Sequence, residues 1–169
     1  GDKNHFGASF ERIESAIRDF NPDIVGVTNL FSTQMSKAFA VTELIKRIDR
    51  NIKVVVGGPH ATAVPQDFLT SPSIDMVVVG EGELTVLDIV DYYAGKKEIQ
   101  DVKGVAYMQA GLMKVNPPEY IQNLDDIPYP AYHLIDMEKY FQLAAAGFGS
   151  RPNDIFYHPM REVSVITSR

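Results

Sequence analysis

Small and polar residues suited to holding a ligand follow three short apolar stretches of this sequence. They include Thr28 and Asn29 after the first stretch, with the apolar Leu30 beside them. Gly57, Gly58 and His60 follow the second stretch, and Gly80, Glu81 and Gly82 follow the third. Glycine lets a backbone approach a ligand closely, while hydroxyl, amide and carboxylate groups can form hydrogen bonds with it. We therefore expect these residues to bind a ligand, and we assign none of them to catalysis.

Several of these residues also have a purely structural explanation. Gly57 and Gly58 could form only a turn, and Thr28 or Asn29 could only cap the following helix. His60 is the only histidine at the expected ligand edge. A lone loop histidine makes a polar contact more often than it coordinates a metal, so we expect a polar contact with a ligand or another domain.

Two carboxylates argue against a bound pyrophosphate at the third stretch. Glu81 and Glu83 flank Gly82, and Thr85 stands where a dinucleotide fingerprint has its third glycine. We expect both carboxylates to favour the dipole of the next helix or to accept hydrogen bonds from ligand amides. The other histidines lie in unrelated segments, so we expect no metal site.

The three apolar stretches predict buried strands of an open parallel sheet. β-Branched residues run there without polar interruption, as in strands covered on both faces. Their predicted ranges are 24–28, 54–57 and 76–79, and helical spacing predicts helices near 9–20, 34–49, 65–70 and 84–94. Ligands of such α/β folds bind outside the carboxyl ends of the strands, where the small and polar residues stand.

The second half of the chain predicts a β-hairpin and a linker. Strands near 102–108 and 112–115 flank a turn at Ala110-Gly111, and a proline-rich acidic stretch follows at 116–130. We also expect a helix near 138–146 and a strand at 162–167. The expected domains are 1–100 for the α/β domain, 101–137 for the hairpin and linker, and 138–169 for the start of another domain.

Composition excludes several functions. The 169 residues carry a formal net charge of -6, which argues against a nucleic-acid or anionic-membrane partner. The chain has no cysteine, so it holds no disulfide, thiolate metal site or cysteine nucleophile. No apolar run approaches the roughly 20 residues of a membrane span, and we expect a cytoplasmic protein.

Three motifs together resemble a known family. They are Asp23-Ile24-Val25-Gly26-Val27-Thr28, Val56-Gly57-Gly58-Pro59-His60-Ala61-Thr62 and Asp75-Met76-Val77-Val78-Val79-Gly80-Glu81-Gly82-Glu83. In this order and spacing they resemble the cobalamin-binding domain of cobalamin-dependent radical S-adenosylmethionine enzymes, in particular the anaerobic magnesium-protoporphyrin IX monomethyl ester cyclase type. The resemblance implies a Rossmann-like or flavodoxin-like fold that binds cobalamin through the residues identified above.

The resemblance also implies a larger parent enzyme. There, a C-terminal barrel would use S-adenosylmethionine and a four-iron four-sulfur cluster, and cobalamin would serve methyl transfer or oxidative cyclisation of a small-molecule substrate. The family's linker resembles Leu124-Asp125-Asp126-Ile127-Pro128-Tyr129-Pro130, and Thr167-Ser168-Arg169 resembles the approach to its cluster cysteines. We expect a fragment that ends before those cysteines and is inactive alone.

The family's first strands have no match before Gly1, so we expect this chain to bind cobalamin weakly or not at all. The alternative is a flavodoxin-like regulatory or interaction module that has lost cobalamin binding.

Overall fold

The computed structural model describes residues 8–139 and residue 141. The helices are α1 Phe10–Phe20, α2 Met35–Ile48, α3 Pro59–Ala63, α4 Pro65–Leu69 and α5 Gly82–Tyr93. The strands are β1 Ile24–Thr28, β2 Lys53–Gly57, β3 Met76–Val78, β4 Val105–Gln109 and β5 Leu112–Asn116. The predicted strand at 162–167 and most of the predicted helix at 138–146 lie outside the described residues.

The five strands form one sheet in the order β1-β2-β3-β4-β5. β1, β2 and β3 are parallel, with Thr28 opposite Gly57 and Val56 opposite Val77, which confirms the predicted parallel core. β4 runs antiparallel to β3, and β5 antiparallel to β4. The predicted hairpin therefore extends the same sheet, and the fold is α/β with a mainly parallel sheet, as expected.

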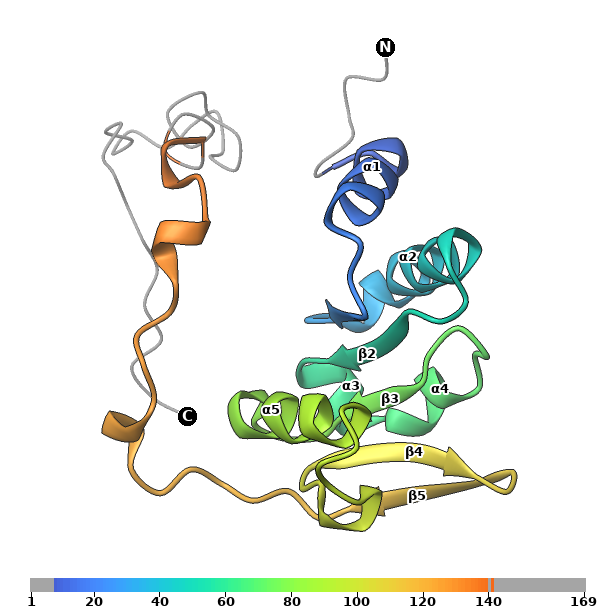
Figure 1. Ribbon diagram of the computed structural model, residues 1–169, viewed down its shortest axis with the longest axis vertical. Coiled ribbons are helices and arrows are strands. Elements are labelled where there is room, and N and C mark those ends of the chain that lie inside the picture. The colour runs from blue at the N-terminus through green and yellow to red at the C-terminus, as the bar shows by residue number, and fades with distance from the viewer. Residues whose placement is uncertain (1–7, 140, 142–169) are drawn as a thin grey trace. The chain divides into compact units, whose positions relative to one another are not determined.

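Helices cover the two faces of the sheet unequally (Figure 1). Ile45 of α2, Phe68 of α4 and the side chains of Val54 and Val56 share one face, and α1 joins them through Ile17. The opposite face is covered by α5, whose Ile89 packs on β2, β3 and β4 residues. On that face Ile24 of β1 is partly covered, whereas Gly26 and Thr28 stay exposed, which matters for the site.

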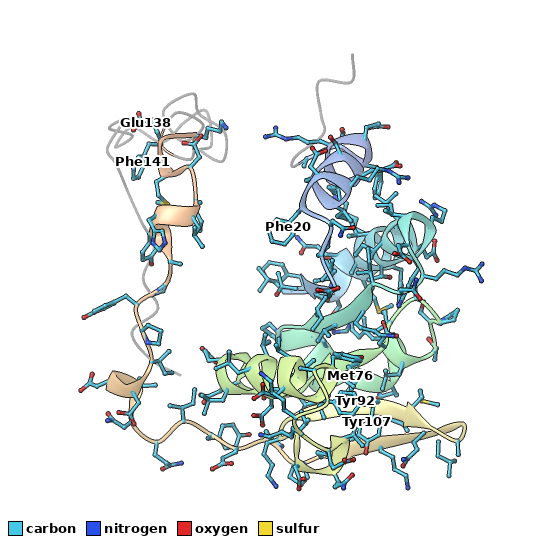
Figure 2. All side chains as sticks on the ribbon, in the orientation of Figure 1. Phe20, Met76, Tyr92, Tyr107, Glu138 and Phe141 are labelled. Atoms are coloured by element: carbon cyan, nitrogen blue, oxygen red, sulfur yellow. The ribbon has the colours of Figure 1, made fainter. Side chains whose placement is uncertain are left out.

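The α5 face also holds an aromatic cluster beside the hairpin. Met76, Tyr92 and Tyr107 lie together there (Figure 2). Tyr92 packs against Tyr93 with ring centroids 5.1 Å apart. Burial, helped by the nearby Asp75 carboxylate, raises the pKa of the Tyr93 hydroxyl.

Helix ends follow the local sequence signals. The Ser9 hydroxyl accepts a hydrogen bond from the Arg12 N–H at the start of α1, and Asn21 closes the helix in a left-handed conformation with φ 49°. The sequence analysis missed α3, which begins directly after Gly58. Pro59 at its first position is compatible with a helix start, because proline lacks only an N–H that would be unsatisfied there.

An ion pair ties α2 to the amino ends of β2 and β3. The Lys46 Nζ donates to Asp75 Oδ2 at 2.7 Å and to the Ile52 carbonyl at 2.7 Å. The same Asp75 oxygen accepts the Val54 N–H at 2.7 Å. These bonds fix the amino ends of both strands relative to each other. They therefore also set where both strands end at the ligand edge.

The chain divides into two compact units, Gly1–Leu124 and Asp125–Arg169. The sheet, its helices and the first part of the linker belong to the first unit. The domain boundaries expected after residues 100 and 137 stay predictions.

Candidate cofactor-binding site

A cavity of about 420 Å³ lies on the α5 face of the sheet, over the carboxyl halves of the parallel strands. Such a volume lies within the range of small-molecule sites. It is lined by Ile24, Gly26, Val27, Thr28, Val55, Gly57, Gly58, Val78, Gly80, Gly82, Val86, Ile89 and Val90. We call it the glycine cavity, because glycines within β1, at the end of β2 and after β3 line it.

The glycine cavity exists because β1 has a glycine at the point where no helix covers that face of the sheet. Side chains alternate between the faces of a strand, so Gly26 and Thr28 share one face of β1. Gly26 stands opposite Val55, and a Cβ built on it meets no atom within 4 Å. α5 borders this space with Val86 and Val90, both of which stay partly exposed.

Contacts within the protein itself explain why residue 58 is a glycine. Its φ is 104°, and a Cβ there would lie 2.6 Å from the Asn29 carbonyl oxygen and 3.0 Å from Thr28 Oγ1. The Asn29 N–H also donates to the Gly57 carbonyl at 2.8 Å. The loops after β1 and β2 therefore touch directly, which only glycine at position 58 permits.

Asn29 is buried without a partner for its side-chain amide. Its relative exposure is 1%, and neither Oδ1 nor Nδ2 has a hydrogen-bond partner among the described residues. A buried amide in this state costs free energy, and such groups call for an explanation such as a missing ligand or water. Asn29 follows Thr28, which lines the glycine cavity, so it stands next to the site.

His60 lies on α3 and does not line the glycine cavity. Its Nδ1 is 3.1 Å from Ser32 Oγ, and its ring packs edge-on to Phe68 with centroids 5.6 Å apart. The histidine therefore links α3 to the segment after β1. Leu30, next to that segment, is 52% exposed.

The loop between β3 and α5 forms one wall of the glycine cavity. Gly80 has φ 88°, and its N–H donates to Thr62 Oγ1 at 3.1 Å. Gly80 and Gly82 line the cavity, whereas the Glu81 Oε2 accepts the backbone N–H of Ile121 at 2.8 Å.

The structure thus brings part of the expected site together. Thr28, Gly57, Gly58, Gly80 and Gly82 line one cavity, whereas Asn29, Leu30, His60 and Glu81 lie outside its lining. Sequence reasoning missed Gly26 and the later α5 residues Val86, Ile89 and Val90. A glycine inside an otherwise apolar strand signals close approach of a ligand or backbone, so Gly26 was detectable.

A second hollow lies across β1 from the first. It measures about 740 Å³ and is bordered by α1, α2 and β1. Residues of α1 such as Ile13 and Phe20 contribute to it, and Phe20 is 82% exposed. It shares Gly26 and Thr28 with the first but lacks the glycines that follow β2 and β3, so we place the candidate site at the glycine cavity.

Within the described part of the chain, His, Asp and Glu side chains form no group of three or more that could hold a metal ion. None of its helices has the length and apolar character needed to cross a lipid bilayer.

An open α/β sheet with a glycine-lined cavity at the strand ends defines a cofactor-binding domain. The family model of the B12 binding domain matches residues 3–90, more than half of the chain. The chain therefore belongs to the B12-binding family.

Two curated relatives and a solved structure agree with this family. A protein of Pyrococcus horikoshii described as an uncharacterized methyltransferase is 42% identical over 134 residues, which cover 78% of this chain and 29% of the relative. The anaerobic magnesium-protoporphyrin IX monomethyl ester cyclase of Rubrivivax gelatinosus is 32% identical over 141 residues, covering 80% and 25%.

The solved structure is the cobalamin-dependent S-adenosylmethionine radical enzyme OxsB with aqua-cobalamin bound. It matches with a TM-score of 0.67 and 25% identity, over 74% of this chain and 18% of that one. The resemblance to cobalamin-binding domains of radical S-adenosylmethionine enzymes is confirmed. The chain spans less than a third of the curated relatives described above.

Proposed function

We propose that the glycine cavity holds the nucleotide tail of cobalamin, with Thr28, Gly57, Gly58, Gly80 and Gly82 as contacts. The observation that carries this is Gly26, where the protein leaves open space on the strand face and no clash explains the glycine. A flat, mostly apolar base could lie against that bare backbone. The cavity is small relative to cobalamin, so it would take part of the cofactor and leave the corrin ring outside.

The residues present fit such a group. The sheet side offers backbone without side chains at Gly26 and Gly57, and the walls are apolar at Val55, Val78 and Val86. Next to Thr28, Asn29 adds a buried amide whose donor and acceptor have no partner among the described residues. A ligand contact to that amide, direct or through a water, would remove the cost of leaving it unpaired.

When bound, cobalamin supplies a cobalt centre that can carry a methyl group or exchange electrons. The chain's own contribution is to bind and orient. The strand-end backbone would set the depth of the tail, the Thr28 hydroxyl could donate to it, and Val86 and Val90 would exclude water from one side.

We further propose that this domain works within a larger radical S-adenosylmethionine enzyme, together with a barrel that binds S-adenosylmethionine and an iron–sulfur cluster. The relatives support this, since one is described as a methyltransferase and another as a cyclase. The reaction would be methyl transfer or oxidative cyclisation of a small molecule. This domain would contribute to the reaction by positioning the cofactor.

Hydroxocobalamin binding to a chain with a filled cavity tests the tail site. In Gly26→Val the added side chain should occupy the glycine cavity, and because no protein atom lies within 4 Å of its Cβ, the fold should persist. We expect hydroxocobalamin retention in equilibrium dialysis to fall at least about ten-fold, equivalent to about 1.4 kcal/mol. Val25→Ile is the matched control, because it adds bulk to the same strand but faces the other side.

Equal retention by the wild-type chain and Gly26→Val would contradict the tail site. Absence of retention by the wild-type chain at millimolar hydroxocobalamin would also contradict the tail site in this chain, but it would not by itself favour the regulatory or interaction module, because weak binding by this chain is already expected. Circular dichroism of both variants shows whether the fold has been kept.

A further inference from the structure

The linker after β5 folds back onto the loop that walls the glycine cavity. The Gly104 N–H donates to the Pro117 carbonyl at 3.1 Å, which fixes the start of the linker. Pro118 then lies against Gly80, since a Cβ built on that glycine would be 3.0 Å from the Pro118 Cβ. Three residues later, the Ile121 N–H donates to Glu81 Oε2 at 2.8 Å.

Three segments meet at this point with little spare room. Gly104 has φ 63°, and a Cβ there would lie 2.8 Å from the Val79 carbonyl oxygen and 2.9 Å from Thr85 Oγ1. The Val79 N–H donates to the Gly104 carbonyl at 2.8 Å. The end of β3, the start of β4 and the linker are therefore held together by backbone contact.

Glu81 connects this junction to the glycine cavity. Its neighbours Gly80 and Gly82 line the cavity. Its carbonyl accepts the Thr85 hydroxyl at 3.1 Å, and it is the residue that precedes the first turn of α5. Its side chain does not line the cavity. It holds the linker instead.

We propose that Glu81 is a positioning residue that fixes residues 117–121 to the wall of the glycine cavity. A shift of the β3–α5 loop then moves the linker, and release of the linker loosens the loop. The part of this proposal that concerns cobalamin rests on the proposed function: occupancy of the cavity steadies the loop and, through Glu81, the linker. Linkage makes the effect reciprocal, so the same bond strengthens cofactor binding.

Amide hydrogen exchange at Ile121, read by NMR on the full chain, tests the fixation without ligand. Glu81→Ala removes the acceptor, and we expect the Ile121 amide to exchange about ten-fold faster, as for loss of a hydrogen bond to a charged group. Glu81→Gln keeps a side-chain carbonyl acceptor and should stay close to the wild-type rate. Glu83→Ala removes a second acidic side chain from the same helix start and serves as the matched control.

Unchanged Ile121 exchange in Glu81→Ala would overturn the fixation. So would equal acceleration in Glu83→Ala, because the effect would then come from charge near the helix start. Two measurements separate local release from global destabilisation. A thermal unfolding curve reports global stability directly, and global loss would also speed amide exchange at Val55 and Val77.

Added hydroxocobalamin tests the coupling. We expect it to slow Ile121 exchange in the wild-type chain and in Glu83→Ala, and to have a much smaller effect in Glu81→Ala. Binding without any change at Ile121 would overturn the coupling and leave the proposed function standing. Absence of binding by the wild-type chain would contradict both the proposed function and the coupling, while the ligand-free rates would still decide the fixation.

Discussion

At the scale of single residues, the site leaves strand backbone bare, and one buried amide next to it has no partner in the described part of the chain. Gly26 and Asn29 are the two clearest cases. Gly26 offers open space on the strand face, and Asn29 holds a buried side-chain amide for which residues 8–139 and 141 provide no partner. Both features cost stability in the unliganded chain, because cavities forfeit packing and unpaired amides forfeit solvation.

Replacing Asn29 by leucine should separate stability from binding. Leucine has a similar branched shape and needs no hydrogen bonds, so we expect unfolding free energy to rise by about 1 kcal/mol. We expect hydroxocobalamin retention to fall in the same variant if the amide serves the ligand. Urea unfolding and equilibrium dialysis measure the two effects.

Asn29→Asp is the opposite control, because a carboxylate buried at this position should lower stability. A loss of stability in Asn29→Leu similar to that in Asn29→Asp would show that the amide has a partner in solution.

At the scale of elements, strand ends are aligned by contacts at both edges of the sheet. Lys46 and Asp75 act at the amino edge, and the contact of Gly58 with the β1 loop acts at the carboxyl edge. The β4–β5 hairpin then closes the side of the sheet next to β3. The cavity depends on these alignments, because its lining comes from three strands and one helix.

Breaking the ion pair should weaken the fold as a whole. In Lys46→Met the aliphatic stem is kept, but Asp75 loses its cation and the Ile52 carbonyl loses its donor. Because both side chains are partly buried, we expect a loss of about 1–3 kcal/mol in urea unfolding. Lys37→Met, on the exposed side of the same helix, should change stability by less than about 0.5 kcal/mol.

The hairpin turn offers a stabilising change. Ala110 has φ 50° and Gly111 has φ 78°, the paired positive values of a type I′ turn. Asparagine tolerates the left-handed region better than alanine, so Ala110→Asn should raise stability by about 0.5 kcal/mol. Gly111→Ala should lower it, and an increase in that variant under urea would contradict the turn assignment.

At the scale of the whole molecule, the B12-binding fold resides in the first compact unit. This unit contains the whole sheet, the glycine cavity and the linker residues fixed by Glu81. A separate unit starts at Asp125. Each unit therefore carries its own local contacts.

A chain of residues 8–124 should fold alone. We expect its midpoint of urea unfolding to match that of the first transition of the full chain, and its hydroxocobalamin retention to be equal. A loss of more than about 1 kcal/mol would mean that residues outside 8–124 stabilise the sheet. Limited chymotrypsin digestion provides a second check, since cleavage near Leu124 should leave a resistant core.

Much of the architecture could be predicted because local patterns specify it. Ser9, Asn21 and Pro22 bound α1, and runs of valine specify β2 and β3, since capping and burial act over a few residues. α3 was missed because Gly57, Gly58 and Pro59 look like a turn in the sequence. Its start depends on Gly58, whose positive φ is set by contact with a distant loop.

The sequence by itself determined the cofactor family, the parallel core and the strand ends that border the site. Only the tertiary structure decided which residues share the cavity. It placed Gly26 and α5 in the cavity lining. It also paired His60 with Ser32 and directed the Glu81 side chain to the linker. The reason is physical: strand periodicity and glycine positions are local, whereas the direction of a loop side chain depends on partners far along the chain.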